Sequence, residues 1–195
     1  MSDGPHKMPP AGAAGEFPLR RDDELPELRS LIRDRIPQLL AIDGMDGVGK
    51  TKGVARKLDL PVVSTDTYIV GNDRYLDGGL RLDDLRADLA KMQATTSVVV
   101  EGCCILEILH RIDRRPDLHV YVRHIDMEGR WRDEETVLGD SAAYLIEYEH
   151  RVTGEHGASQ LAIDLINYHA KFRPWAKRRS DRHIAMVGWG AQRRA

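Results

Sequence analysis

One stretch of sequence decides the fold of this chain: Gly44, Met45, Asp46, Gly47, Val48, Gly49, Lys50 and Thr51. It fills the pattern G-x-x-x-x-G-K-[ST] at every position, and it lies between an apolar run at residues 39–42 and an expected helix at residues 50–58. Glycines let the backbone turn tightly enough to point its N–H groups at phosphate oxygens, and a following helix adds its positive N-terminus. The stretch therefore predicts a phosphate-binding loop in which all of these residues contact a nucleotide.

Two side chains of this loop predict specific contacts to a nucleoside triphosphate. The Lys50 ammonium is expected to reach the β- and γ-phosphates, and the Thr51 hydroxyl is expected to bind Mg²⁺. The alternative is a glycine-rich turn that merely ends a strand. The complete pattern between a strand and a helix favours an ATP and Mg²⁺ site instead.

Apolar runs and helical spacings alternate along the rest of the chain. Strands are expected at residues 39–42, 61–63, 98–100, 118–122 and 183–187. Helices are expected at residues 26–35, 50–58, 82–92, 105–112, 127–151 and 159–172. Continuous apolar strands separated by helices predict an α/β fold. We expect a three-layer α/β/α sandwich around a parallel sheet of five strands.

Composition and the two ends set the limits of the domain. Residues 1–25 are rich in Pro, Gly and Ala and predict a disordered tail, which leaves one domain at residues 26–195. The formal net charge of −2 argues against a surface built for nucleic acid. No apolar run is long enough to span a membrane, and the N-terminus does not resemble a secretory signal. Cys103 and Cys104 are adjacent, so a disulfide between them could not link distant parts of the chain. We therefore expect a cytoplasmic protein.

Two acidic residues follow expected strands. Asp66 comes after the strand at residues 61–63, and Glu101 directly follows the strand at residues 98–100. Ligands of parallel α/β sheets bind at the carboxyl ends of the strands, so both side chains are expected at the site. A carboxylate there can accept a proton from an attacking hydroxyl or hold a metal ion. The alternative for each is a loop-capping Asp and a solvated Glu.

A loop of about fifteen residues follows Asp66, and loops of this length within a compact domain are usually functional. It contains Tyr68, Arg74 and Tyr75. The tyrosines can supply rigid apolar walls and hydroxyl groups, so the loop predicts a pocket for a phosphate acceptor. The alternative is a surface loop without a ligand.

Arg130 and Arg132 follow the expected strand at residues 118–122. A helical lid at about residues 126–151 would let these arginines close over a transferring phosphate and neutralise its charge. In a surface helix they would instead form i,i+4 ion pairs with Glu134 and Glu128. Both interpretations remain open.

The phosphate-binding loop, the acid at Asp66 and the Val-Val-Val-Glu-Gly sequence at residues 98–102 resemble the P-loop kinases of the uridine kinase-like group. These are similar in fold to nucleoside monophosphate kinases, and the resemblance covers roughly residues 38–187. It implies that Asp66 is the base toward the acceptor hydroxyl and that Glu101 contacts the metal or the substrate. Thr65 stands where uridine kinases typically have a second acid, and residues 44–50 are more similar to thymidylate kinases.

The expected function is therefore an ATP- and Mg²⁺-dependent kinase that transfers the γ-phosphoryl group to a small hydroxyl- or phosphate-bearing acceptor, such as a nucleoside or nucleotide. Lys50, Asp66, Arg130 and Arg132 would be its catalytic residues. A GTPase is disfavoured because the chain has no Asn-Lys-x-Asp guanine-binding sequence. The alternative is a nucleotide-dependent binding module. Its basic C-terminal segment, residues 171–195, has eight Lys or Arg residues and one acid and would engage nucleic acid or a protein partner.

Overall fold

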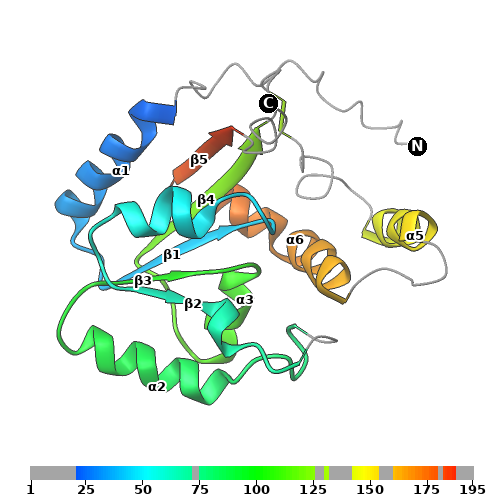
Figure 1. The fold of residues 1–195 in the computed structure, drawn as a ribbon, viewed down its shortest axis with the longest axis horizontal. Helices are drawn as coiled ribbons and strands as arrows, with labels where there is room; N and C mark the ends of the chain where they lie inside the picture. The colour runs from blue at the N-terminus through cyan, green and yellow to red at the C-terminus, as the bar shows by residue number, and fades with distance from the viewer. Residues whose placement is uncertain are drawn as a thin grey trace, which may run out of the picture.

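A parallel sheet forms the centre of the protein, as a computed structural model shows (Figure 1). The structure describes residues 21–71, 75–125, 130–131, 142–153, 160–179 and 182–187. The strands are β1 (Leu39–Gly44), β2 (Val62–Ser64), β3 (Val98–Glu101), β4 (Leu118–Ile125) and β5 (Arg182–Val187). Their order across the sheet is β2-β3-β1-β4-β5, and each pair of neighbours is parallel.

Helices cover both faces of this sheet. The α-helices are α1 (Arg21–Arg35), α2 (Leu82–Gln93), α3 (Ile105–Arg111), α5 (Ala142–Thr153) and α6 (Gln160–Arg179). Three short helical segments, η2 (Lys50–Val54), η3 (Ala55–Lys57) and η4 (Thr65–Tyr68), lie in the connections. The expected α/β fold with a parallel sheet flanked by helices is confirmed. No helix in the described part of the chain is long and apolar enough to cross a membrane.

The core has two halves because side chains along a strand alternate between the faces of the sheet. Leu40 and Ile42 of β1 pack with Leu28 of α1 and with η2 and η3. Leu39 and Ala41 pack with α2, α3 and α6 on the other face. In Figure 1, α2 and α3 lie on one side of the sheet and the cyan helical segment after β1 lies on the other.

The bounds of α1, α5 and α6 differ from the sequence prediction by several residues. Helix α1 begins at Arg21 rather than at residue 26, because Leu25 also packs against the core beside Leu28; residues 1–20 lie outside the described residues. Helix α6 continues to Arg179, beyond the expected end at residue 172. The helix expected at residues 127–151 corresponds to α5, which begins at Ala142 and ends at Thr153. Arg130 and Trp131 are not helical, and the other residues before α5 lie outside the described part.

The chain reverses its direction of connection between β1 and β3, which are neighbours in the sheet. The loop after β1 leads to η2 on one face, whereas the connection after β3 leads to α3 on the opposite face. Where adjacent parallel strands connect to opposite faces, their carboxyl ends leave a space in which ligands bind. Residues 44–51 and residues 101–104 meet at this point.

Candidate functional site

The loop at residues 44–49 is a tight turn that depends on its glycines. Gly44 has a φ of 148°, and a Cβ atom there would lie 2.5 Å from the backbone oxygen of Val122 in β4. Gly47 and Gly49 have φ values of 71° and 91°. Asp46 shapes the turn because its Oδ1 accepts a hydrogen bond of 2.8 Å from the Gly47 N–H. Side chains larger than hydrogen are therefore excluded by space at Gly44 and disfavoured by conformation at the other two.

The segment after this loop is not the continuous helix expected at residues 50–58. It is one π-helical turn, η2, followed by one 3₁₀ turn, η3. The Ala55 N–H is shared between the carbonyl oxygens of Lys50 and Thr51. Gly53 lowers the helix propensity within the segment, and β2 begins at Val62, so the chain has little room for a longer helix. The contribution expected from the N-terminus of a helix is correspondingly smaller.

The Lys50 side chain is folded back into the loop and is only 7% exposed. Its Nζ donates to the carbonyl oxygens of Gly44 at 3.1 Å and Met45 at 2.7 Å, and to Cys103 Sγ at 3.4 Å. Burial raises the pKa of Cys103 to about 11 although the nearby Lys50 charge lowers it, so the thiol stays protonated. No carboxylate among the described residues forms an ion pair with the Lys50 ammonium.

A second buried charge lies at the end of β3. Glu101 is 1% exposed, and its Oε1 accepts a hydrogen bond of 3.0 Å from Thr51 Oγ1. Among the described residues, no Lys, Arg or His pairs with this carboxylate. Carboxylate and hydroxyl oxygens are suitable ligands for Mg²⁺, which keeps several waters and needs few protein ligands. The pair therefore fits a divalent cation, although the described residues contain no cluster of three or more metal-binding side chains.

Sequence reasoning missed Asp43, a third buried carboxylate, which directly precedes the loop. Its Oδ1 accepts the Gly44 N–H at 2.8 Å, and its Oδ2 accepts the Tyr168 hydroxyl of α6 and lies 3.4 Å from His119 Nε2. Burial alone would raise the pKa of Asp43. The hydrogen bonds of His119 and Tyr168 and the charges of His119 and His169 together outweigh burial, so the pKa of Asp43 lies below its usual value. Asp43 thus anchors the first N–H of the loop. The sequence signal was an acid at the end of an apolar strand.

Asp66 lies at the same edge of the sheet as Glu101 but is exposed. It belongs to η4, which begins at the end of β2, and Ser64 of β2 is the register partner of Glu101 in β3. Asp66 is therefore two residues beyond the partner of Glu101. The structure places one carboxylate in solvent and the other in the core.

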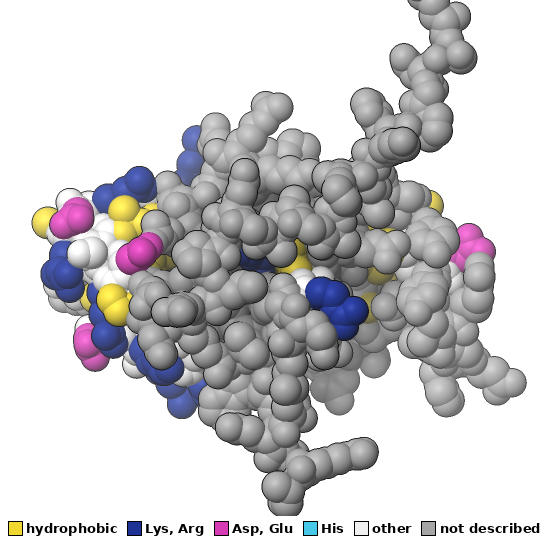
Figure 2. All heavy atoms as spheres, turned by 90° about the horizontal axis from the view of Figure 1, so that it is seen from above, with side chains coloured by type: hydrophobic (Ala, Val, Ile, Leu, Met, Phe, Trp, Pro, Cys, Tyr) yellow, Lys and Arg dark blue, Asp and Glu magenta, His cyan; other side chains and the backbone are white. Residues whose placement is uncertain are grey.

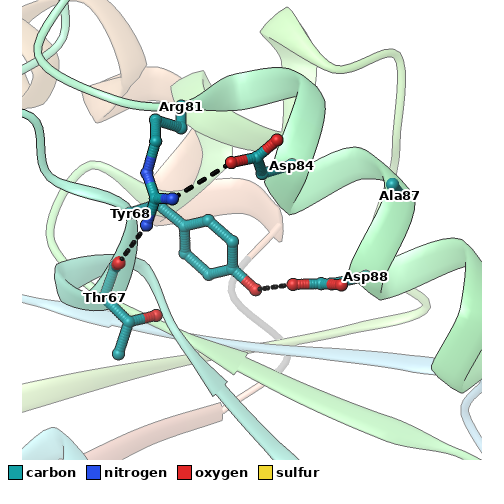
Figure 3. A pocket seen from close by; sticks show the side chains of 6 residues that line it. All are labelled: Thr67, Tyr68, Arg81, Asp84, Ala87 and Asp88. Carbon is teal, nitrogen blue, oxygen red and sulfur yellow. Dashed lines mark hydrogen bonds and ion pairs between the residues drawn. The ribbon is translucent and has the colours of Figure 1, made fainter.

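Tyr68, one of the two predicted pocket tyrosines, lines an open pocket of about 400 Å³ between η4 and α2 (Figure 3). Its hydroxyl donates to Asp88 Oδ2 at 2.7 Å, and the Arg81 guanidinium lies 5.8 Å from the ring centre. Burial and this hydrogen bond raise the pKa of Tyr68 to about 12. Tyr75 is 4% exposed and is directed into the core. Arg74 lies outside the described residues.

The predicted lid arginines are only partly described. Arg130 is exposed, whereas Arg132 lies outside the described residues. Between them, the ring of Trp131 packs edge-on against Tyr121 of β4, with ring centres 6.1 Å apart, and the Arg123 guanidinium lies 5.3 Å from the Trp131 ring centre. These contacts hold Trp131 beside β4. Contact of Arg130 or Arg132 with phosphate stays a prediction.

Replacing Gly102 by Ala is expected to disturb the junction between β2 and β3. A Cβ at Gly102 would lie 1.9 Å from Thr65 Oγ1 and 3.0 Å from Thr65 Cβ, and Thr65 is completely buried. Overpacking of this kind costs about 1–3 kcal/mol, so the urea midpoint of Gly102→Ala should fall. Ser97→Ala is the control, because Ser97 directly precedes β3 and its replacement by Ala adds no atoms. An unchanged midpoint in Gly102→Ala would contradict the packing described.

No protein family matches the chain, and no curated protein shows significant similarity to it.

Proposed function

We propose that this protein is an ATP- and Mg²⁺-dependent phosphotransferase with a P-loop kinase fold, which transfers the γ-phosphoryl group to a small hydroxyl- or phosphate-bearing acceptor. A nucleoside or nucleotide-like metabolite is the acceptor that the sequence resemblance favours. The observation that carries the proposal is the Lys50 ammonium, which is 7% exposed and forms no ion pair with the described carboxylates. A buried cation is costly without an anion, so the site favours an anionic ligand.

Lys50 would serve the transfer as a movable charge. Its present acceptors are two neutral carbonyl oxygens and a thiol, and charge-assisted hydrogen bonds to phosphate oxygens are roughly twice as strong as neutral ones. The ammonium can therefore exchange these partners for phosphate when a nucleotide binds. It would then neutralise the charge that develops on the transferred group.

Thr51 and Glu101 would hold Mg²⁺ between the loop and β3. Their oxygens already lie 3.0 Å apart, and the Glu101 carboxylate has no described cation to balance its charge. When bound, the ion would supply neutralisation and orientation of the phosphates. Thr51 belongs to η2 and Glu101 to β3, so an ion bound by both residues would also hold the loop to the sheet.

Asp66 would accept the proton of an acceptor hydroxyl. Its exposure on η4 leaves the carboxylate accessible to a small molecule, in contrast to the buried Glu101. A general base must come within hydrogen-bond reach of the proton that it removes. The exposed position supports Asp66 as the base and Glu101 as the metal ligand.

The alternative, a nucleotide-dependent binding module, depends on the basic residues 171–195. Most of their side chains lie outside the described part of the structure. On the face drawn in Figure 2, the described Lys and Arg side chains are interspersed with acidic and apolar ones. Steeply salt-dependent nucleic-acid binding without acceptor-stimulated turnover would support this alternative over the kinase.

The proposal is tested by ADP release from ATP and Mg²⁺ across a panel of nucleosides, nucleoside monophosphates and other small alcohols. One class of acceptor should stimulate release, and Glu101→Gln should raise the Mg²⁺ concentration required by about 10–100-fold. Asp117→Asn is the control, because Asp117 accepts the N–H groups of Gln38 and Leu39 at the opposite edge of the sheet. Absence of stimulation by every acceptor, with unchanged Mg²⁺ dependence in Glu101→Gln, would refute the proposal.

A further inference from the structure

The Tyr75 hydroxyl lies between the ends of two strands of the candidate site. It donates a hydrogen bond of 3.1 Å to the Cys103 carbonyl oxygen, and it lies 3.2 Å from Thr65 Oγ1. Thr65 directly follows β2, and Cys103 is the second residue after the end of β3. Tyr75 is 4% exposed and Thr65 is completely buried, so water does not compete for these contacts.

Cys103 and Thr65, the two partners of Tyr75, lie next to two residues of the proposed site. These are Lys50, which would bind the transferred phosphate, and Asp66, which would face the acceptor hydroxyl. Cys103 accepts a hydrogen bond from Lys50 Nζ through its sulfur atom, at 3.4 Å. Thr65 precedes Asp66 in η4. The Tyr75 hydroxyl therefore connects Cys103, which contacts Lys50, with Thr65, which precedes Asp66.

Donor and acceptor roles in this bridge are fixed by chemistry. The phenol has one hydrogen, which is directed to the Cys103 carbonyl oxygen, so it must accept the hydrogen of the Thr65 hydroxyl. Burial raises the pKa of Tyr75 well above its usual value, and the Thr65 hydrogen bond offsets only part of this rise. The phenol is therefore protonated at neutral pH and can donate to the Cys103 carbonyl oxygen.

The backbone next to Tyr75 is clamped by two helices. The Leu76 N–H donates to Asp164 Oδ2 of α6 at 3.0 Å. Arg111 of α3 donates to the Leu76 carbonyl oxygen at 2.5 Å and to Asp77 Oδ1 at 3.1 Å. The backbone that directly follows Tyr75 is therefore held in place by α3 and α6.

We propose that Tyr75 is a positioning residue whose hydroxyl fixes the spacing between Lys50 and Asp66 by joining Cys103 to Thr65. This inference rests on the proposed function, in which Lys50 holds the transferred phosphoryl group and Asp66 faces the acceptor hydroxyl. Reacting groups must be held about 3–3.5 Å apart and aligned, so a small displacement of either side lowers the rate.

Tyr75→Phe tests the bridge because it keeps the buried ring and removes only the hydroxyl. We expect kcat to fall about tenfold, with KM for ATP changed by less than about twofold, since Lys50 itself is retained. Thr65→Val removes the other hydroxyl at nearly constant shape and should lower kcat similarly. The double variant should be no slower than either single variant, because each change breaks the same bridge.

Tyr121→Phe is the matched control. It removes a buried tyrosine hydroxyl that contacts His169 Nε2 at 2.7 Å, and Tyr121 is 1% exposed. Its urea midpoint should fall about as much as that of Tyr75→Phe, by the loss of one hydrogen bond, without the change in kcat. Equal kcat losses in Tyr75→Phe and Tyr121→Phe, or fully additive losses in the double variant, would overturn the proposal.

Hydrogen exchange of the free protein gives a readout that does not require turnover. Tyr75→Phe and Thr65→Val should each accelerate amide exchange both in η4 and around Cys103, whereas Tyr121→Phe should not. Unchanged exchange in either segment would overturn the bridge. If the wild-type protein releases no ADP with any acceptor while the exchange result holds, the proposed function fails and the bridge between the two segments stands.

Discussion

Replacing Lys50 by Met is expected to abolish almost all phosphoryl transfer while leaving the protein folded. Loss of one preorganised group that stabilises the transition state typically costs about 10²–10³-fold in turnover. The fold should survive because the ammonium contacts only neutral acceptors and because Met fills the space of the aliphatic stem. Removing a buried charge that has no described anionic partner should leave the free energy of unfolding unchanged or raise it.

Lys52→Met is the matched control for this variant. Lys52 also belongs to η2 but is exposed, so its loss should change neither turnover nor the urea midpoint appreciably. Both variants are compared by ADP release at saturating ATP and acceptor, and by urea unfolding. Near-normal turnover in a folded Lys50→Met protein would contradict the kinase proposal, whatever the other variants do.

The fold class could be predicted because its signals are local. Strands β1 and β3 each begin with an uninterrupted run of apolar residues, β4 is largely apolar from Leu118 to Val122, and α2 places Leu85 and Leu89 on one helical face. The loop at residues 44–51 could be located because its glycines and its lysine follow a fixed spacing. By contrast, the helix expected at residues 50–58 became two short turns, since its length was limited by the start of β2.

The arrangement of the site could not be predicted because it depends on contacts between distant residues. The approach of Lys50 to Cys103 requires that β1 and β3 be neighbours, which no local pattern indicates. Asp43 gains its importance from His119 and Tyr168, which lie far along the chain. Tyr75 was expected to face an acceptor, and only the packing around Thr65 shows that its hydroxyl faces inward.

Replacing Asp66 by Asn should lower turnover with little change in ATP affinity or stability. Removal of a general base costs about 10²–10⁴-fold in rate. An amide keeps the shape of the carboxylate, and substitutions at exposed positions usually change stability by less than about 0.5 kcal/mol. The measurements are kcat, the ATP dissociation constant and the urea midpoint, with Asp83→Asn as the control because Asp83 is exposed on α2 and pairs with Arg86.

The outcome also decides how the two carboxylates divide their roles. A base contacts the acceptor and not the nucleotide, so excess Mg²⁺ should not restore the turnover of Asp66→Asn. If ATP affinity instead collapses in Asp66→Asn and recovers with excess Mg²⁺, Asp66 is the metal ligand. Glu101, buried and in contact with Thr51, would then have to accept the proton, and the acceptor hydroxyl would have to reach it at the carboxyl ends of β1 and β3.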